Sequence, residues 1–195
     1  MKKDRQENEN GVRYERLCRN NFNTHSLDGF VRHQVIHESW RETDGQWKLV
    51  PNEFEENWSV DMCREIAEDV ERHMETDQSA FGAFADGKVV GFITVSHHLF
   101  GTAARYAELV CFQVSEPYRG WGIGRGLFAL AVEEMAAIGA DRLYISAHSS
   151  KESQAAYRAL GYTHAEEINQ SLAEKEPFDV QLEYKNDLTF SKMRI

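Results

Sequence analysis

The chain has 195 residues, a formal net charge of −10 at pH 7, and 42% hydrophobic and 11% aromatic residues. This length suits one globular domain with a substantial core. Nucleic acids and anionic membrane surfaces are bound through basic faces, so the acidic balance argues against both partners and favours a cationic one. Three widely spaced cysteines without a C-x-x-C pair indicate neither a disulfide framework nor a thiolate zinc site. Because the first residues carry no apolar signal segment, we expect a cytoplasmic protein with reduced thiols.

The chain is predicted to form a single domain between two short tails. The polar composition of residues 1–10 predicts a disordered N-terminal tail. No linker, repeat or low-complexity tract divides residues 11–187, and residues 188–195 are assigned to a C-terminal tail. Within the domain, residues 12–18 are typical of a strand, and Ser26 is placed to begin a short helix because serine is a good N-cap.

A hairpin and a helix are predicted between residues 35 and 77. Asp44-Gly45 is a typical two-residue turn, and β-type sequence flanks it within residues 35–50. Ser59 is a good N-cap for the helix that follows. The apolar residues of this helix recur at helical spacing: Val60, Cys63, Ile66, Ala67, Val70 and Met74. The acidic residues concentrated between Glu53 and Asp77 take the other face, which predicts a solvated helix surface.

The second half alternates strands and helices. Asp86-Gly87 is the turn of a hairpin within residues 80–95, and a third antiparallel strand is predicted at 106–114. A helix follows from Ile123 to near Gly139. Since the chain must cross over this helix, the next strand, at 142–147, is predicted to lie parallel to the strand at 106–114. The remaining predictions are a helix at 151–160 capped by Ser150 or Ser149, and an antiparallel pair at 162–168 and 178–184.

A Gly-rich loop joins the strand at 106–114 to the following helix. Gly120, Gly122 and Gly124 occupy alternate positions between Arg119 and Arg125. Glycine allows close approach and positive φ, so such a loop can direct several backbone N–H groups and a helix N-terminus at one anion. Residues 117–132 contain two arginines and no acidic residue. We interpret the loop as a cradle for a pyrophosphate.

The spacing of the glycines distinguishes between three kinds of phosphate-binding loop. The P-loop requires G-x-x-x-x-G-K-[ST], and no Gly-Lys-Ser/Thr occurs here. The dinucleotide fingerprint requires G-x-G-x-x-G, but a match that starts at Gly120 meets Arg125 at its last position. The remaining match is R-x-x-G-x-G, from Arg119 to Gly124.

In this setting the chain resembles the GNAT superfamily of acyl-CoA-dependent N-acyltransferases, whose signature is [QR]-x-x-G-x-[GA]. Downstream, S-S-K-E-S-Q-A-A-Y-R-A-L-G-Y is similar to the next motif of that family, N-x-x-A-x-x-x-Y-x-x-x-G-F. Tyr157 takes the place of its tyrosine, while Ser150 and Tyr162 replace the usual Asn and Phe. Residues 26–55 differ from the two helices that commonly cover the acceptor in the family. The resemblance implies an α/β (α+β) GNAT fold, with a central mixed, mostly antiparallel sheet, flanking helices and a parallel strand pair around the CoA loop.

The resemblance also implies the reaction and its participants. The co-substrate is expected to be acetyl-CoA, and no metal is expected. A primary amine is expected to attack the thioester directly in a ternary complex. A small-molecule amine ranks ahead of a protein amine as the acceptor. The thioester oxygen would be met by a backbone N–H near residues 112–114. The residues expected to bind CoA are Phe112, Gln113, Val114, Arg119, Gly120, Trp121, Gly122, Ile123, Gly124, Arg125, Ser150, Ser153 and Tyr157. Homodimers are common in this superfamily, so the resemblance leaves a homodimer open.

Two residues are candidates for moving protons, and each has a structural alternative. Glu108 lies in the strand before the loop, where some relatives carry a catalytic Glu; it is the candidate base for the amine, or else faces solvent. Tyr157 is the candidate acid for the CoA thiolate, or else a packing tyrosine. Cys111 is interpreted as a buried packing thiol rather than a nucleophile. The alternative to an enzyme is a CoA-sensing or partner-binding module that has lost turnover.

Overall fold

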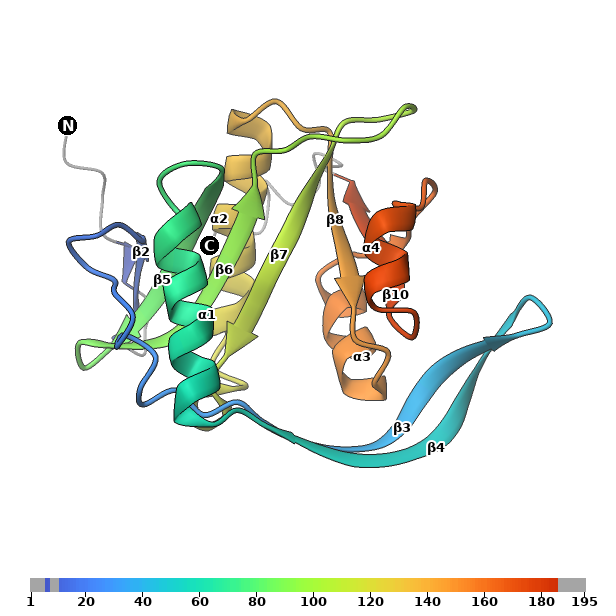
Figure 1. Cartoon of the computed structure of the whole chain (residues 1–195), viewed down its shortest axis with the longest axis horizontal. Helices are drawn as coiled ribbons and strands as arrows, with labels where there is room; N and C mark the ends of the chain where they lie inside the picture. Colours follow the sequence, from blue (N-terminus) through green and yellow to red (C-terminus); the bar gives the residue numbers. More distant parts are fainter. Residues whose placement is uncertain (1–5, 8–10, 186–195) are drawn as a thin grey trace. The chain divides into compact units, whose positions relative to one another are not determined.

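The computed structural model describes residues 6–7 and 11–185, which divide into two compact units. Unit 1 contains the described residues before 35, together with 56–98 and 109–134. Unit 2 contains residues 35–55, 99–108 and 135–185. Figure 1 shows the chain, with labels on helices and strands of both units. The predicted C-terminal tail, 188–195, lies outside the described residues, as do residues 1–5 and 8–10 of the predicted N-terminal tail. No helix in the described part of the chain is long and apolar enough to cross a membrane.

An antiparallel sheet forms the body of unit 1. Its strand order is β1 (Gln6–Glu7), β2 (Arg13–Arg16), β5 (Gln78–Ala85), β6 (Lys88–Ser96) and then residues 109–114 of β7 (Tyr106–Val114). At the β5–β6 turn, Asp86 and Gly87 have φ of 49° and 74°, as a two-residue hairpin turn with positive φ requires. The three predicted antiparallel strands that lead to the Gly-rich loop are therefore confirmed.

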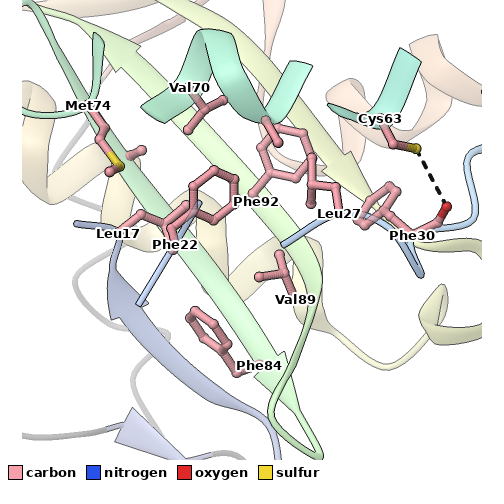
Figure 2. Close-up of a cluster of buried hydrophobic side chains, with 12 residues drawn as sticks. Leu17, Phe22, Leu27, Phe30, Cys63, Val70, Met74, Phe84, Val89 and Phe92 are labelled. Carbon is pink, nitrogen blue, oxygen red and sulfur yellow. Dashed lines mark hydrogen bonds between the residues drawn. The ribbon is translucent and has the colours of Figure 1, made fainter. Parts of the chain in front are cut away.

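Helix α1 (Val60–His73) begins where the sequence predicts. Ser59 is its N-cap, and the serine side chain accepts a hydrogen bond of 3.2 Å from the N–H of Met62. Its apolar face packs on a cluster of buried side chains that includes Leu17, Phe30 and Phe92, shown in Figure 2. Burial of this apolar surface is what stabilises an amphipathic helix of this length.

The short helix expected at Ser26 is wrong, because the structure has consecutive turns there. The Ser26 hydroxyl accepts from the N–H of Asn23, and the Asn23 side chain accepts from the N–H of His25. Serine and asparagine side chains that bond the local backbone in this way compete with helical hydrogen bonds.

Helix α2 (Ile123–Ala137) packs through residues 123–134 on the unit 1 sheet at short range. A Cβ placed on Gly91 of β6 would lie 3.0 Å from side-chain atoms of Ile123 and of Leu127. A Cβ on Gly124 would lie 3.5 Å from the ring of Phe112, whereas Cys111 packs against the apolar cluster that contains α1 residues. Neighbouring residues of a strand face opposite sides of a sheet. Phe112 therefore lies on the α2 face, and Cys111 lies on the opposite, α1 face.

Among the described strands, the one parallel pairing is in unit 2. Residues 106–108 of β7 pair in parallel with residues 142–144 of β8 (Arg142–Ala147), as predicted. Strand β10 (Val180–Lys185) pairs antiparallel with both β8 and the short β9 (Thr163–His164). The sequence predicted that residues 162–168 and 178–184 form a final antiparallel pair. This is confirmed in part: β9 and β10 do pair antiparallel, but the longer pairing of β10 is with β8. Together the strands and helices form the mixed, mostly antiparallel α/β fold that the sequence predicts.

Two helices and a hairpin complete unit 2. Helix α3 (Lys151–Ala159) agrees with the prediction, whereas the short α4 (Gln170–Lys175) was not predicted. Strands β3 (His33–Thr43) and β4 (Gln46–Asn57) pair as a hairpin whose turn residues, Asp44 and Gly45, have φ of 53° and 72°. Residues 35–55 of this hairpin belong to unit 2, where the N–H of Trp40 donates to the carbonyl of Ser149 at 2.8 Å.

A polar network links side chains of β7, β8 and β10 in unit 2. The fully buried carboxylate of Glu183 accepts from Arg142 at 2.8 Å and from the hydroxyl of Tyr106 at 2.6 Å. The exposed Glu166 bridges Arg142, at 2.8 Å, and Lys185, at 2.5 Å. These two cations hold the pKa of Glu166 at about 2, with the hydrogen bond to Lys185 as the largest cause. The network therefore favours ionised carboxylates in the folded chain.

Candidate active site

Strand β7 changes partner near its middle. Its register with β6 places Thr94 opposite Cys111 and Val95 opposite Leu109, so Val110 is the additional residue of a β-bulge. The N–H of Cys111 donates to the Thr94 hydroxyl at 3.0 Å. Residues 106–108 pair with β8 and residues 109–114 with β6. The bulge thus marks the point at which the strand turns from one pairing to the other.

The Gly-rich loop follows β7 and a short 3-10 turn, η1 (Glu116–Tyr118). Gly120 and Gly122 have φ of 83° and 78°, and a Cβ at either position would have nothing within 4 Å. The backbone conformation, rather than lack of space, therefore requires glycine at these two positions. Helix α2 begins at Ile123, and its first N–H groups have no acceptor within the helix. The loop and helix N-terminus together form a site suited to an anion.

The two arginines of the loop differ in their surroundings. Arg119 donates through Nη1 to the carbonyl of His33 at 2.9 Å and through Nε to the carbonyl of Val114 at 3.3 Å. Burial, and then the charge of Arg32, lower the pKa of Arg119. Arg125, in the first turn of α2, is exposed, as Arg119 also is. Arg119 therefore secures the base of the loop, and the guanidinium of Arg125 is accessible to a ligand.

The CoA-binding residues expected from the sequence fall into two groups. Those from Phe112 to Arg125 form one continuous segment of unit 1: the end of β7, the loop and the first turn of α2. Ser150, Ser153 and Tyr157 lie in unit 2. Ser150 is fully buried and caps α3, because its hydroxyl accepts from the N–H of Ser153 at 3.2 Å. The predicted capping role of Ser150 is confirmed.

The two candidates for proton transfer also lie in unit 2. Glu108 is half-buried on β7, opposite Tyr144 of β8 in the parallel pairing. Burial raises the pKa of Glu108 above the ordinary carboxyl value, and the charge of Lys175 partly offsets this rise. Tyr157 is half-buried on α3, and its ring stands edge-on to Tyr162 with centroids 5.4 Å apart. Burial thus makes the Glu108 carboxylate more basic than an exposed one.

A cavity of ≈ 330 Å³ opens in unit 1 between α1 and the bulge of β7. Its lining residues are Glu65, Ile66, Asp69, Val70, Gln78, Thr94, Val110 and Cys111. The acidic residues Asp61, Glu65, Glu68 and Asp69 of α1 are exposed, as the predicted solvated face requires, and Glu65 and Asp69 of this face also line the cavity. Desolvation raises the pKa of the Cys111 thiol to about 12, consistent with the predicted packing role of this cysteine.

Arg32 is a buried cation that sequence reasoning did not identify. Its side chain is 8% exposed and pairs with Glu56 at 2.7 Å through Nη2. Among the described residues, its Nε and Nη1 atoms are buried and have no hydrogen-bond partner. Nothing in the local pattern around Arg32 indicates burial, because the positions that cover it are distant in sequence.

No metal site is indicated in the described part of the chain, where no three His, Cys, Asp or Glu side chains group closely enough to hold an ion.

Comparison with known proteins agrees with the fold. A sequence profile described as the Acetyltransferase (GNAT) family matches residues 35–162. A crystal structure of nourseothricin acetyltransferase superposes with a TM-score of 0.66 at 20% identity, over 90% of this chain and 99% of that chain. A protein assigned as a streptothricin acetyltransferase, from Bacillus anthracis strain Ames and in complex with acetyl coenzyme A, superposes with a TM-score of 0.64 at 13% identity over the same shares. No curated protein matches the sequence.

Proposed function

The chain belongs to the GNAT acetyltransferase family, and on this basis we propose that it transfers the acetyl group of acetyl-CoA to a primary amine of a small molecule, by direct attack in a ternary complex. The observation that carries the proposal is the loop after β7, where Gly120 and Gly122 adopt positive φ immediately before the N-terminus of α2. This geometry suits the pyrophosphate of CoA, which is a dianion that needs several N–H donors.

Residues of unit 1 supply the binding and electrostatic part of the mechanism. Backbone N–H groups of the loop and of the first turn of α2 bind the pyrophosphate, and the exposed Arg125 adds a positive charge. A backbone N–H within residues 112–114 stabilises the negative charge that develops on the thioester oxygen. The bulge at Val110 supports this role because it redirects the strand just before these residues.

Residues of unit 2 supply the proton transfers. An aliphatic amine has an unperturbed pKa of about 10, so it must lose a proton before it attacks. Glu108 takes this proton directly or through a water, and its raised pKa brings it closer to the working pH. The departing CoA thiolate, with a pKa of roughly 8–9 by analogy with cysteine, takes a proton from Tyr157.

The acceptor is proposed to be a cationic small molecule. The chain carries a net charge of −10, and Glu65 and Asp69 place two carboxylates at the cavity beside Val110 and Cys111. Opposite charge raises the local concentration of an ammonium group. The structural neighbours named for nourseothricin and streptothricin support a small molecule over a protein amine.

A thiol-release assay with acetyl-CoA and a panel of amines, peptides and aminoglycosides tests the proposal. We expect release of the CoA thiol to accelerate with at least one small amine, and mass spectrometry to show that amine acetylated. Tight binding of acetyl-CoA without acceleration by any member would instead support the non-catalytic, CoA-sensing alternative.

A further inference from the structure

The cavity of ≈ 330 Å³ in unit 1 has a floor formed by three neighbouring strands. Ala80 of β5 belongs to the buried cluster on which α1 packs, and its partner in β6 is Thr94, whose partner in β7 is Cys111. Residues directly opposite one another in a sheet lie on the same face, as do residues two apart in a strand. Gln78 of β5 therefore lies with Thr94 and Cys111 on the α1 face, and all three line the cavity. An amide, a hydroxyl and a thiol thus form its floor.

This floor is uncharged and retains unused hydrogen-bonding groups. Thr94 is only 1% exposed, and its hydroxyl oxygen accepts from the N–H of Cys111 at 3.0 Å. Among the described residues, nothing accepts the proton of this hydroxyl, and the side-chain amide of Gln78 makes no hydrogen bond. Buried polar groups in proteins are usually satisfied by a protein group, a ligand or a water. The floor therefore suits a polar but uncharged group of a ligand.

The acidic side of the cavity comes from α1. Glu65 and Asp69 both line the cavity and lie one helical turn apart. The Cβ atoms of residues spaced in this way are about 5–6 Å apart, so both carboxylates can contact one ammonium. In the part of the chain that the structure describes, the carboxylate of Glu65 has no hydrogen bond or ion pair, and that of Asp69 lies 3.4 Å from Nδ1 of His73. The remaining lining side chains are apolar: Ile66, Val70, which Figure 2 shows on α1, and Val110.

Two carboxylates are poorly suited to bind the amine that reacts. An amine attacks a thioester in its neutral form, and a negative charge within about 4–6 Å favours the protonated form. An amine held between Glu65 and Asp69 would therefore be a weaker nucleophile. The same carboxylates suit an amino group that stays protonated, whereas the uncharged floor suits the nitrogen that must become neutral. The floor is also next to the proposed reaction centre, because Cys111 directly precedes residues 112–114.

We propose that the acceptor is an aliphatic diamine or polyamine, and that Glu65 and Asp69 bind an ammonium of this acceptor that does not react. A second amino group lies at the floor and receives the acetyl group, and the methylene chain between them packs on the apolar lining residues. The new N–C bond replaces the C–S bond of acetyl-CoA, and the proton lost by the attacking nitrogen balances the one gained by the CoA thiolate. The inference rests on the proposed acetyl transfer and narrows its substrate class to molecules with two or more amino groups.

Two acceptors of equal length test the proposal. At neutral pH, 1,4-diaminobutane and 4-aminobutan-1-ol differ only in carrying an ammonium or a hydroxyl at the far end. The kcat/KM for CoA thiol release is measured for both compounds with the wild type, Glu65→Gln, the double variant Glu65→Gln/Asp69→Asn, and Glu68→Gln. Glu68→Gln is the matched control for Glu65→Gln, because it removes an exposed carboxylate of α1 that lies 3.9 Å from Arg72 and is not among the residues lining the cavity.

The expected preference follows from the exposure of the two carboxylates. Each exposed ion pair accounts for up to about five-fold in affinity, so two account for roughly 10- to 25-fold. We expect the wild type and Glu68→Gln to prefer the diamine by this factor, and Glu65→Gln to lose about five-fold of the preference. The double variant should retain only the statistical factor that arises from the two equivalent ends of the diamine. The Kd for acetyl-CoA should change by less than about two-fold in each variant, because the substitutions lie outside the Gly-rich loop.

Three results would overturn the inference: a wild-type preference no larger than the statistical factor, an unchanged preference in the double variant, or an equal loss of preference in Glu68→Gln and Glu65→Gln. If the double variant does not fold, Glu65→Gln alone gives the test. If the wild type acetylates neither compound, isothermal titration calorimetry of both compounds with the CoA-bound protein decides. Tighter binding of the diamine, reduced in the Glu65 variants, supports the inference, and equal affinities refute it. The proposed function fails separately if no amine of the thiol-release panel is acetylated.

Discussion

Substitution of Gly122 by alanine gives a direct prediction for the Gly-rich loop. Gly122 has φ of 78°, and a Cβ at this position would have nothing within 4 Å, so the substitution causes no steric overlap with the rest of the chain. The perturbation is therefore backbone strain, which costs an L-residue in the left-handed region about 1–2 kcal/mol. The loop can relieve this strain only by rotating a peptide unit, and that rotation moves an N–H away from the bound anion.

The expected loss of affinity follows from the hydrogen bond that is lost. A hydrogen bond to a charged group contributes about 1.5–3 kcal/mol, so the Kd for acetyl-CoA should rise by roughly 10- to 150-fold. Isothermal titration calorimetry measures this Kd. Thermal unfolding of the ligand-free protein should show a decrease in Tm of about 2–8 °C for the strain itself.

Gly45→Ala is a matched control in the β3–β4 turn. Gly45 has φ of 72° and also has nothing within 4 Å of a Cβ, so its substitution introduces the same kind of strain without touching the loop. We expect a similar decrease in Tm and an unchanged acetyl-CoA affinity. If Gly122→Ala binds acetyl-CoA as tightly as the wild type, or if both variants lose affinity equally, the loop is not the phosphate-binding element.

Three further variants test the proton transfers and the polar network of unit 2. Tyr157→Phe removes the proposed acid, so kcat should fall by about 100-fold or more while acetyl-CoA affinity is retained; normal turnover with a large loss of affinity would show that the hydroxyl binds rather than reacts. Glu108→Gln removes a carboxylate whose pKa is raised by burial, so the loss of rate should be greatest between the pKa of Glu108 and that of the amine, where the carboxylate is ionised and the amine is still protonated, and an unchanged pH–rate profile would exclude Glu108 as the base. The folded-state pKa of Glu166, about 2, lies below its ordinary value of 4.5, so its contribution to stability is present above the ordinary pKa and is lost as pH falls toward 2. Glu166→Gln should therefore weaken the acid dependence of the urea midpoint in this range, and an identical dependence in variant and wild type would show that Arg142 and Lys185 do not couple Glu166 to folding.

The features that the sequence predicted well are those with local causes. The turns at Asp44-Gly45 and Asp86-Gly87 have residues that tolerate positive φ, and Ser59 has the side chain that caps a helix. The strand–loop–helix segment could be predicted because glycine spacing and hydrophobic period change together at residues 114–123. Such signals depend on a few neighbouring residues, so distant packing does not override them.

The features that were missed depend on distant contacts. Helix α4 is only six residues long and has no buried residue, so it lacks a clear apolar period. The bulge at Val110 has no glycine to mark it. The burial of Arg32 and the placement of Glu65 at a cavity require segments far apart in the sequence. The features on which the proposed acceptor site rests were consequently beyond local reasoning, whereas the conformation of the Gly-rich loop was not.

A rapid-quench single-turnover experiment with acetyl-CoA and an accepted amine tests the central claim most directly. The protein is mixed with limiting acetyl-CoA, with and without the amine, and the free CoA thiol, the acetylated amine and any acetylated protein are quantified over time. The proposed mechanism predicts that CoA thiol and acetylated amine appear together in equal amounts, only when the amine is present, and without an acetylated protein intermediate. Accumulation of acetylated protein before the product, or thiol release that does not depend on the amine, would contradict it.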